Sequence, residues 1–531
     1  FIRSYPGPGM VTPFVLLCNE RQGVYMGFHE RDINISCFIH EIKPGYKDSY
    51  HSRVPGGDMV GNSPAGFCVR AARMPFIQPG EKTELAPLVM NLFSGSWRRG
   101  IEPYREWRQT WYASKSQPEW LDKMDSWLTV HLNSPENRLR YKYADLPDLA
   151  REASEYGVRG MQILGWAIGG QDRAEPYQDT DPLLGTKEEL KQSIQQIKDM
   201  GIRVLLMCKF KWADRTHQKY REEMESCAIR DMYGKPVHFE GYGYQTLSQF
   251  LPGGSRITGS GVCHLSEKYR ELAVREFHKI LDLEPHGIQY DELSNHIIMC
   301  FDENHGHKPG ECTFKGSVEL SKRFYEAANQ KDPDFLMAAE GPNDVLSQYY
   351  PVNYIRSWGG FNNGEPIHQA AWKFLNPDMK FATCITGWDD REMINQCMVY
   401  GYIMDFEPYH FKGRLSDYPL TMNYAKKCLS LRRALSDYLI KGEFRDAIGP
   451  GIRVEPENAE YIYSVFQNRK TGKSAIVIAN QGEQTIAVKA TLDNGNRDFL
   501  MYSPEMEGKE NSNGKESIPG RGLLVFIETT G

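Results

Sequence analysis

Residues 126–440 alternate between short apolar runs and segments with a helical period, and this alternation constrains the fold more than any other feature. Strands and helices that follow one another in this way build a parallel sheet. Eight alternations over about 310 residues match a (β/α)8 TIM barrel with one large insertion. The sequence predicts its strands at 126–133, 158–165, 202–209, 286–291, 335–340, 353–358, 380–386 and 401–405.

Helical segments are expected between these strands. The segment 186–200 has the clearest boundaries, because Thr186 and Glu189 stand at the spacing of a capping box and Gly201 follows as a stop. The insertion, at about 214–264, follows the third strand and therefore lies at the active-site end of a barrel. Further helices are predicted at 266–284, 317–330, 365–375, 391–399 and 417–438.

The chain on either side of the barrel is rich in β-type alternation. Residues 1–95 show short alternating segments divided by Gly, Pro and Asp turns, which predicts an N-terminal β-sandwich. We expect the sequence to begin partway through this domain. Residues 96–125 form a linker with a helix near 97–112. Residues 441–531 predict a small C-terminal β-sandwich. The expected fold class is therefore multidomain α/β plus all-β, with a central TIM barrel flanked by two β-sandwiches.

Composition excludes several classes of partner. The 531 residues are 40% hydrophobic and 25% charged, and no apolar run approaches the length of a membrane span. A net charge of −6 gives no reason to expect nucleic acid. The chain opens at Phe1 without a signal peptide, so we expect a processed form. Secreted, periplasmic and cytoplasmic locations stay open, as does the oligomeric state.

Carboxylates close three of the predicted strands or follow them directly. Asp291 ends the fourth strand, Glu340 ends the fifth, and Asp389 follows the seventh. A β/α barrel presents its catalytic groups at these carboxyl ends. Strand alternation places Asp291 and Glu340 on faces that point to the barrel rim. Two carboxyl groups facing each other there are what glycosidic bond cleavage requires, so the sequence predicts an O-glycosyl hydrolase.

Neighbouring strand ends favour a retaining mechanism. Retaining glycosidases hold their carboxyl groups about 5–5.5 Å apart, whereas inverting ones leave about 6.5–9.5 Å for a water molecule. The shorter aspartate suits nucleophilic attack, which we assign to Asp291. The longer glutamate, with a pKa raised by an apolar site, suits the acid/base role, which we assign to Glu340. The alternatives are a salt-bridged or helix-capping role for either group, with Glu292 as the rival nucleophile.

Further side chains at the predicted strand ends are candidates for substrate binding. Aromatic rings would stack on sugars, basic groups would bind hydroxyls or screen the nucleophile, and Asp389 would strengthen hydroxyl contacts in the transition state. The alternatives are surface lysines, helix N-caps and incidental turn residues, and Asp405 and Glu407 are weaker candidates. The substrate-binding candidates are Trp166, Asp172, Lys209, Lys211, Glu292, Arg356, Trp358, Trp388 and Asp389.

No cofactor or metal is expected. The eleven cysteines are scattered without a Cys-x-x-Cys pair. Cys300 and Cys312 flank a polar loop and could pair, which sequence alone leaves open. His305 and His307 lie in a loop rich in Gly, Asn and Lys, where we expect solvated histidines rather than ligands.

Several segments resemble the α-galactosidase group of retaining α-glycoside hydrolases. Gly165–Gly170, Pro182–Leu190 and Ile197–Val204 are similar to the second barrel unit of that group, with its Lys-x-x-Gly turn before the third strand. Gly287–Asp291 resembles its fourth strand, which an aspartate nucleophile closes. The resemblance implies a sandwich, barrel, sandwich order and retaining hydrolysis of an α-linked sugar.

The sixth strand departs from that pattern. The α-galactosidases carry an acid/base aspartate after it, and here Arg356 and Trp358 stand in that region. The order Asp291, Glu340, Asp389 instead resembles the α-amylase superfamily and the endo-α-N-acetylgalactosaminidase-type barrels, although Gln289 replaces the arginine of α-amylases. The alternatives are a carbohydrate-binding protein on an inactive barrel, and a transglycosylase or lyase. Sugar identity and exo or endo action stay open.

Overall fold

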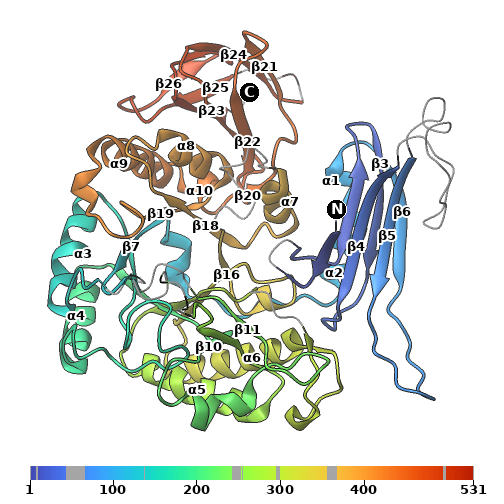
Figure 1. The fold of residues 1–531 in the computed structure, drawn as a ribbon. Coiled ribbons are helices and arrows are strands. Elements are labelled where there is room, and N and C mark those ends of the chain that lie inside the picture. Colours follow the sequence, from blue (N-terminus) through green and yellow to red (C-terminus); the bar gives the residue numbers. More distant parts are fainter. Residues whose placement is uncertain are drawn as a thin grey trace.

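A closed barrel forms the middle of the molecule, with antiparallel sheets from the two ends of the chain on its flanks (Figure 1). In the described part, no helix is both long and apolar enough to span a membrane. The computed structural model describes residues 2–7, 10–43, 66–134, 136, 138–241, 251, 253, 255–294, 299–355, 367–493, 495 and 498–529.

The barrel contains eight parallel strands, as the alternation in the sequence predicts. Their order around the closed sheet is β13-β16-β17-β18-β19-β7-β8-β9, so neighbours in sequence are neighbours in space. The sixth strand covers Val352–Tyr354, and the predicted strand positions 356–358 lie outside the described residues. The strands are β7 (Ser126–His131), β8 (Gly160–Leu164), β9 (Arg203–Cys208), β13 (Gly287–Tyr290), β16 (Leu336–Glu340), β17 (Val352–Tyr354), β18 (Lys380–Ile385) and β19 (Ile403–Phe406).

The helices around the barrel follow the predicted segments closely. At the start of α4, the Thr186 hydroxyl accepts a hydrogen bond from the Glu189 amide at 3.1 Å, and the Glu189 carboxylate accepts one from the Thr186 amide at 2.6 Å. The predicted capping box is therefore confirmed. These helices are α4 (Lys187–Asp199), α5 (Glu267–Leu281), α6 (Thr313–Lys331), α7 (Ile367–Leu375), α8 (Arg391–Tyr400), α9 (Pro419–Ala434) and α10 (Ser436–Leu439).

One helix, α3 (Leu146–Glu155), is missing from the sequence prediction. Pro147 lies in its first turn, where a missing amide hydrogen needs no partner. Leu146, Leu149, Ala150 and Ala153 recur at the spacing of one helical face and are buried. The helical period was therefore present, although it spans only ten residues.

Two of the loops at the carboxyl end of the barrel carry strands of their own. After β9, the strands β10 (Trp212–Asp214), β11 (His238–Phe239) and β12 (Gly259–Gly261) form a small sheet in the order β10-β12-β11. This is the predicted insertion, of which residues 242–250 lie outside the described residues. After β13, β14 (Met299–Cys300) and β15 (Glu311–Cys312) form a hairpin.

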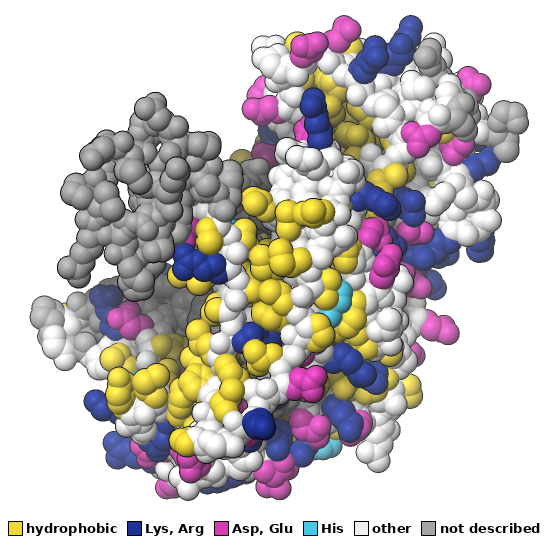
Figure 2. Space-filling view, turned by 90° about the vertical axis from the view of Figure 1, so that its right-hand side faces the viewer, with side chains coloured by type: hydrophobic (Ala, Val, Ile, Leu, Met, Phe, Trp, Pro, Cys, Tyr) yellow, Lys and Arg dark blue, Asp and Glu magenta, His cyan; other side chains and the backbone are white. Residues whose placement is uncertain are grey.

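The N-terminal residues form two antiparallel sheets that lie beside the barrel (Figure 1). The predicted linker helix is two short helices, α1 (Trp97–Gly100) and α2 (Glu102–Gln109). Figure 2 looks from the side of these sheets and shows hydrophobic side chains there; Leu17, Leu88, Met90 and Leu92 are exposed. The sheets are β1 (Ile2–Tyr5), β4 (Ser36–Lys43) and β5 (Gly66–Arg73), and β2 (Phe14–Cys18), β3 (Gln22–Phe28) and β6 (Leu88–Ser94).

Buried hydrogen bonds attach the N-terminal region to the barrel. The carboxylate of Asp344, in the loop after β16, accepts a hydrogen bond from the Tyr5 hydroxyl at 2.6 Å and another from Tyr104. All three side chains are buried. Asn343 accepts hydrogen bonds from the amides of Val345 and Leu346. Asn343, rather than Glu340, therefore caps the turn in this loop.

The C-terminal residues also form two antiparallel sheets, whose apolar side chains share one core. Helix α8 packs against β22 and β23 of the larger sheet. The larger sheet contains β20 (Glu443–Phe444), β22 (Tyr461–Gln467), β23 (Ser474–Asn480), β28 (Leu523–Glu528), β25 (Phe499–Tyr502) and β26 (Glu510–Ser512), and the smaller one contains β21 (Gly451–Glu455), β24 (Ile486–Thr491) and β27 (Lys515–Ile518).

We expect Gly287→Ala to lower the free energy of unfolding by about 1–3 kcal/mol through overpacking. A Cβ atom at Gly287, the first residue of β13, would lie 2.3 Å from the Leu336 carbonyl oxygen on the neighbouring strand. Gly451→Ala is the matched control, because its Cβ atom would meet only one atom, at 4.0 Å, at the start of β21. Urea denaturation compares the two variants, and equal stabilities would contradict the expected clash.

Candidate active site

Lys209 stands at the centre of a cluster of carboxylates at the carboxyl end of the barrel. Its side chain is completely buried. The ammonium group forms ion pairs with Asp172, with Asp291 at 2.9 Å and with Glu292 at 3.1 Å. These residues follow three neighbouring strands, β8, β9 and β13, whose carboxyl ends meet at one edge of the sheet. Lys209, a predicted substrate-binding or screening residue, is thus the ion-pair partner of three carboxylates.

Barrel register brings the two predicted catalytic carboxyls together. Tyr290 pairs with Ala339, so Asp291, directly after β13, and Glu340, the last residue of β16, stand side by side. A hydrogen bond joins their carboxyl groups. Glu340 also accepts a hydrogen bond from the Glu292 amide at 3.0 Å. Burial raises the pKa of Glu340 well above its usual value, and the negative charge of Asp291 raises it further.

Two residues of the cluster have strained backbones. Asp172 and Glu292 have φ angles of 60° and 56°, in the left-handed region that side chains with a Cβ atom rarely adopt. Such conformations cost about 1–3 kcal/mol each and persist where surrounding contacts hold them. Glu292 is held on two sides, since its carboxylate pairs with Lys209 and accepts a 2.7 Å hydrogen bond from the Trp212 indole.

Glu175 is a member of the cluster that the sequence prediction missed. It lies on the loop after β8, three residues beyond Asp172, and is buried. Burial raises its pKa well above the usual value, the positive charge of Lys209 opposes this shift, and Asp172 and Asp291 reinforce it. The signal available in the sequence was the local density of acids, since Asp172 and Glu175 follow a predicted strand end.

The cluster holds more acids than one cation can balance. Among the described residues, five carboxyl groups influence one another around the Lys209 ammonium group, those of Asp172, Glu175, Asp291, Glu292 and Glu340. Burial raises the pKa of Asp172 to about 7 although Lys209 lies beside it. Part of the cluster therefore keeps its protons at neutral pH. An arrangement of this kind supplies both an ionised carboxylate and a protonated carboxylic acid within one site.

Two predicted substrate-binding residues have other contacts. Trp166 is buried, and its indole donates a hydrogen bond to the Met207 carbonyl at 2.8 Å. The ring that was expected to stack on sugars therefore packs inside the protein and links the loop after β8 to β9. Lys211 does not join Lys209. Its ammonium group donates to the Ser317 hydroxyl of α6 at 3.0 Å and lies over the Phe314 ring. Burial lowers the pKa of Lys211 to about 7.

Asp389 and Trp388, predicted after the seventh strand, contact residues outside the cluster. Asp389 forms ion pairs with Arg521 of the C-terminal region at 2.9 Å and with Arg391 at 3.4 Å. Trp388 is 64% exposed, and its ring lies beside Tyr418. Arg356 and Trp358 lie outside the described residues.

Further polar pairs join side chains of different barrel strands or of the loops that follow them. The Tyr354 hydroxyl donates to the buried Glu407 carboxylate, and Thr129 donates to Asp405 at 2.6 Å. Asp405 and Glu407, the weaker sequence candidates, therefore lie in the barrel as hydrogen-bonded partners of other strands. His131, at the end of β7, contacts Gln171, and burial lowers its pKa to about 3, so it is neutral.

The chain belongs to a protein family described as a domain of unknown function (DUF6259), whose model matches residues 86–360. A comparison with curated proteins found no match. Solved structures similar in fold include the α-galactosidase AgaA from Geobacillus stearothermophilus, with a TM-score of 0.64 and 12% identity over 100% of this chain and 72% of that chain.

Two other solved structures extend this comparison. The α-N-acetylgalactosaminidase NagBb from Bifidobacterium bifidum has a TM-score of 0.61 and 13% identity over 88% of this chain and 72% of that chain. An α-amylase from Geobacillus thermoleovorans has a TM-score of 0.53 and 12% identity over 78% of this chain and 100% of that chain. The resemblance inferred from short sequence motifs is thus confirmed as a likeness of fold.

Lys209→Met should destabilise the protein by about 3–5 kcal/mol at neutral pH, because it leaves buried carboxylates without their cation. The loss should shrink as the pH falls and the carboxylates take up protons. Urea denaturation between pH 4 and 8 measures both effects. A small loss that does not change with pH would contradict the central role of this ammonium group.

Lys211→Met is the matched control, since Lys211 is also buried and lies two residues away. Its pKa in the folded protein, about 7, is below that of an unfolded lysine, so the wild type gains stability as the pH rises from about 7 toward 10. Methionine removes this titration. At pH 7 the variant should therefore be at least as stable as the wild type.

Proposed function

We propose that this protein is a glycoside hydrolase that cleaves an α-linked glycosidic bond by a retaining mechanism, with Asp291 as nucleophile and Glu340 as acid/base. One observation carries the proposal. Asp291 and Glu340 stand together at the carboxyl end of adjacent barrel strands, one paired with a buried lysine and the other with a raised pKa. In the proposal, Asp291 is the ionised group and Glu340 the protonated one, as the chemistry needs.

In the first step, Glu340 donates its proton to the glycosidic oxygen as the bond to the anomeric carbon breaks. Asp291 attacks that carbon and forms a glycosyl ester, and the aglycone leaves as an alcohol. Lys209 favours the ionised form of Asp291, because an opposite charge at 2.9 Å stabilises a carboxylate. Glu340 remains protonated through its burial and through the neighbouring negative charge.

In the second step, Glu340 is ionised and acts as a base. It removes a proton from a water molecule, whose oxygen attacks the anomeric carbon and releases Asp291 as a carboxylate. Two inversions at one carbon give net retention. Glu340 recovers its proton in this step, so the enzyme returns to its starting state without a cofactor.

Hydrogen bonding places Asp291 and Glu340 closer together than the 5–5.5 Å or so that retaining glycosidases use. In the proposal, the glycosidic oxygen and anomeric carbon of the substrate enter between the two carboxyl groups and replace this hydrogen bond. Because the two groups start in contact, the retaining mechanism needs a separation of only about 5–5.5 Å, which is less than the roughly 6.5–9.5 Å that inversion needs. A sugar complex should show the two groups about 5–5.5 Å apart.

Substrate identity is proposed from the similar folds. Their names point to α-galactosides and α-linked N-acetylgalactosamine as the first sugars to test. The proposed acid/base stands at a different strand from the acid/base of the α-galactosidases that the sequence resembles. Glu340 closes the fifth strand, whereas α-galactosidases carry this residue after the sixth. Arg356 and Trp358 are proposed to bind the sugar from that sixth strand.

Asp291→Asn should reduce kcat on an aryl α-glycoside by about 10⁴-fold or more, since no nucleophile remains. Glu340→Gln should reduce kcat/KM by about 10²–10⁴-fold on substrates with poor leaving groups, and by less on activated aryl glycosides, which need little protonation. Initial rates on a panel of aryl and natural α-galactosides and α-N-acetylgalactosaminides measure both effects, and NMR of the first product reports the anomeric configuration.

Asp378→Asn is the control. Asp378 lies just before β18, at the opposite end of the barrel, and its exposed carboxylate pairs with Arg469. It should keep wild-type rates. An inverted product, or full activity in Asp291→Asn, would contradict the proposed mechanism. Binding of sugars without any turnover by the wild type would favour the inactive-barrel alternative.

Glu340 should also lower stability as the pH rises. Its pKa is raised in the folded protein, so the folded state binds a proton that the unfolded state releases near pH 4.3, and stability falls between that pH and the higher folded pKa. Glu340→Gln cannot ionise. The melting temperature of the variant should therefore exceed that of the wild type by a margin that grows with pH, as thermal unfolding across pH 4–8 can measure.

Glu267→Gln provides a control of opposite sign. Hydrogen bonds from Arg323 and Arg270 lower the pKa of Glu267 to about 2, so its contribution to stability is present above about pH 4.3 and is lost as the pH falls toward 2. This variant should be less stable than the wild type at neutral pH. A pH-independent margin for Glu340→Gln would contradict the raised pKa.

A further inference from the structure

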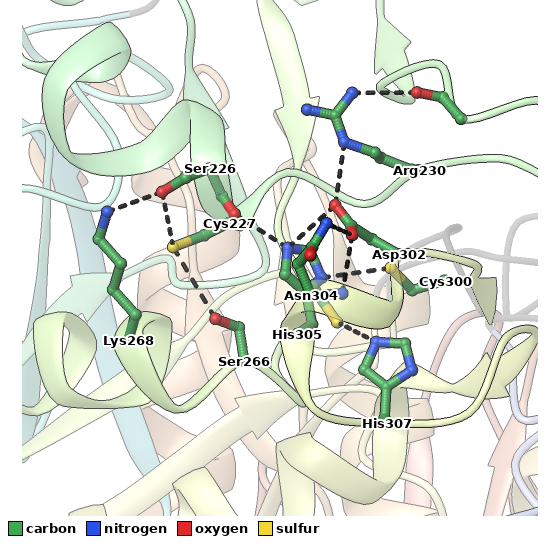
Figure 3. A network of polar contacts seen from close by, with 12 residues as sticks. Ser226, Cys227, Arg230, Ser266, Lys268, Cys300, Asp302, Asn304, His305 and His307 are labelled. Atoms are coloured by element: carbon green, nitrogen blue, oxygen red, sulfur yellow. Dashed lines mark hydrogen bonds and ion pairs between the residues drawn. The ribbon is translucent and has the colours of Figure 1, made fainter.

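Four potential metal ligands meet in the loops beyond β9 and β13. They are Cys263, just after β12, Cys300 in β14, and His305 and His307 in the turn that follows. One ligand atom from each lies within 4.8 Å of all the others. Figure 3 shows Cys300, His305 and His307 gathered at one place. The sequence prediction of solvated histidines is wrong for His305, which is only 7% exposed.

Distances within the group match a tetrahedral zinc site. Cys263 Sγ lies 3.3 Å from His307 Nε2, and Cys300 Sγ lies 3.4 Å from His305 Nδ1. Zinc bonds of about 2.3 Å to sulfur and 2.0–2.1 Å to nitrogen, at tetrahedral angles, place neighbouring sulfur and nitrogen ligands roughly 3.5 Å apart. The side chains therefore need little rearrangement to enclose an ion.

Backbone carbonyl groups orient both histidine rings for metal binding. His305 Nε2 lies 2.9 Å from the Ser226 carbonyl oxygen, and His307 Nδ1 lies 2.8 Å from the Lys308 carbonyl oxygen. A carbonyl oxygen only accepts, so each of these nitrogens carries the hydrogen. The other nitrogen of each ring then has a free lone pair, and it is the one that faces a cysteine sulfur. Metal-binding histidines are oriented in this way.

We propose that Cys263, Cys300, His305 and His307 bind one structural zinc ion. Two thiolates and two imidazoles are the ligand set that zinc takes in closed, four-coordinate sites. Four protein ligands leave no position for water or substrate, so the ion would stabilise structure rather than take part in chemistry. The proposal does not depend on the proposed glycosidase activity.

The ion would join two loops that support the carboxylate cluster. Cys263 belongs to the insertion after β9, whereas the other three ligands lie in the loop that follows β13 and Asp291. The insertion also reaches the cluster directly. Trp212 of β10 pairs with Gly261 of β12, two residues before Cys263, and donates a hydrogen bond to Glu292. Zinc would thus fix the strand that places Trp212 against Glu292.

Metal content of the native protein tests the proposal directly. Protein purified under reducing conditions without chelators should contain about one zinc per chain by mass spectrometry of the metal. X-ray absorption should show two sulfur ligands at about 2.3 Å and two nitrogen ligands at about 2.0–2.1 Å. Removal of zinc with a strong chelator should lower the melting temperature, and zinc chloride alone should restore it.

Cys300→Ser and His307→Ala should each reduce bound zinc roughly tenfold or more at a fixed low zinc concentration, because the loss of one ligand opens the coordination shell. His307 is only partly buried, so its variant is the less disruptive of the two. Cys312→Ser is the matched control. Cys312 is buried on the same hairpin but is not among the four ligands, so its variant should retain wild-type zinc.

Three results would overturn the proposal. The first is wild-type protein that neither contains zinc nor takes it up after reduction. The second is a disulfide between Cys263 and Cys300 in the native protein, found by mass spectrometry of peptides. The third is equal zinc content in Cys300→Ser, His307→Ala and Cys312→Ser, which would mean that any bound zinc lies elsewhere.

Discussion

The rest of the site depends on the ion pairs that the buried ammonium group of Lys209 forms. Lys209 pairs with Asp172, Asp291 and Glu292, and its own side chain and that of Asp172 are completely buried. Without it, the negative charges of these acids would repel one another with little solvent screening. With it, a carboxylate beside the ammonium group is favoured in its ionised form, while burial raises the pKa of Glu175 and Glu340. The proposed mechanism uses this difference to give two chemically similar groups different roles.

Sequence periodicity was sufficient to predict the barrel and to place Asp291 and Glu340 at the carboxyl ends of neighbouring strands. The strand and helix alternation is a local pattern, and parallel register then places Asp291 beside Glu340 through the pairing of Tyr290 with Ala339. The capping box at Thr186 was predictable for the same reason, since all its partners lie within three residues. The helix α3 shows the limit, because its apolar face spans only ten residues.

Contacts between distant segments could not be predicted in this way. Asp389 pairs with Arg521, which lies more than a hundred residues away in the C-terminal region, and no local pattern announces such a partner. Lys209 and Lys211 follow the same strand, yet one enters the carboxylate cluster and the other packs on α6. The clustering of the cysteines and histidines could not be predicted for the same reason, since α5 and β13 separate Cys263 from its partners along the sequence.

Backbone strain connects the loops with the electrostatics of the cluster. Asp172 and Glu292 both adopt left-handed conformations, and both carboxylates pair with Lys209. Removal of the ammonium group would therefore remove the contacts that hold two strained residues in place, in addition to leaving charges unpaired. Trp212 provides a second hold on Glu292 through the insertion. The barrel strands set the position of the backbone that carries these acidic residues. The loops after β8, β9 and β13 set the direction in which their side chains point.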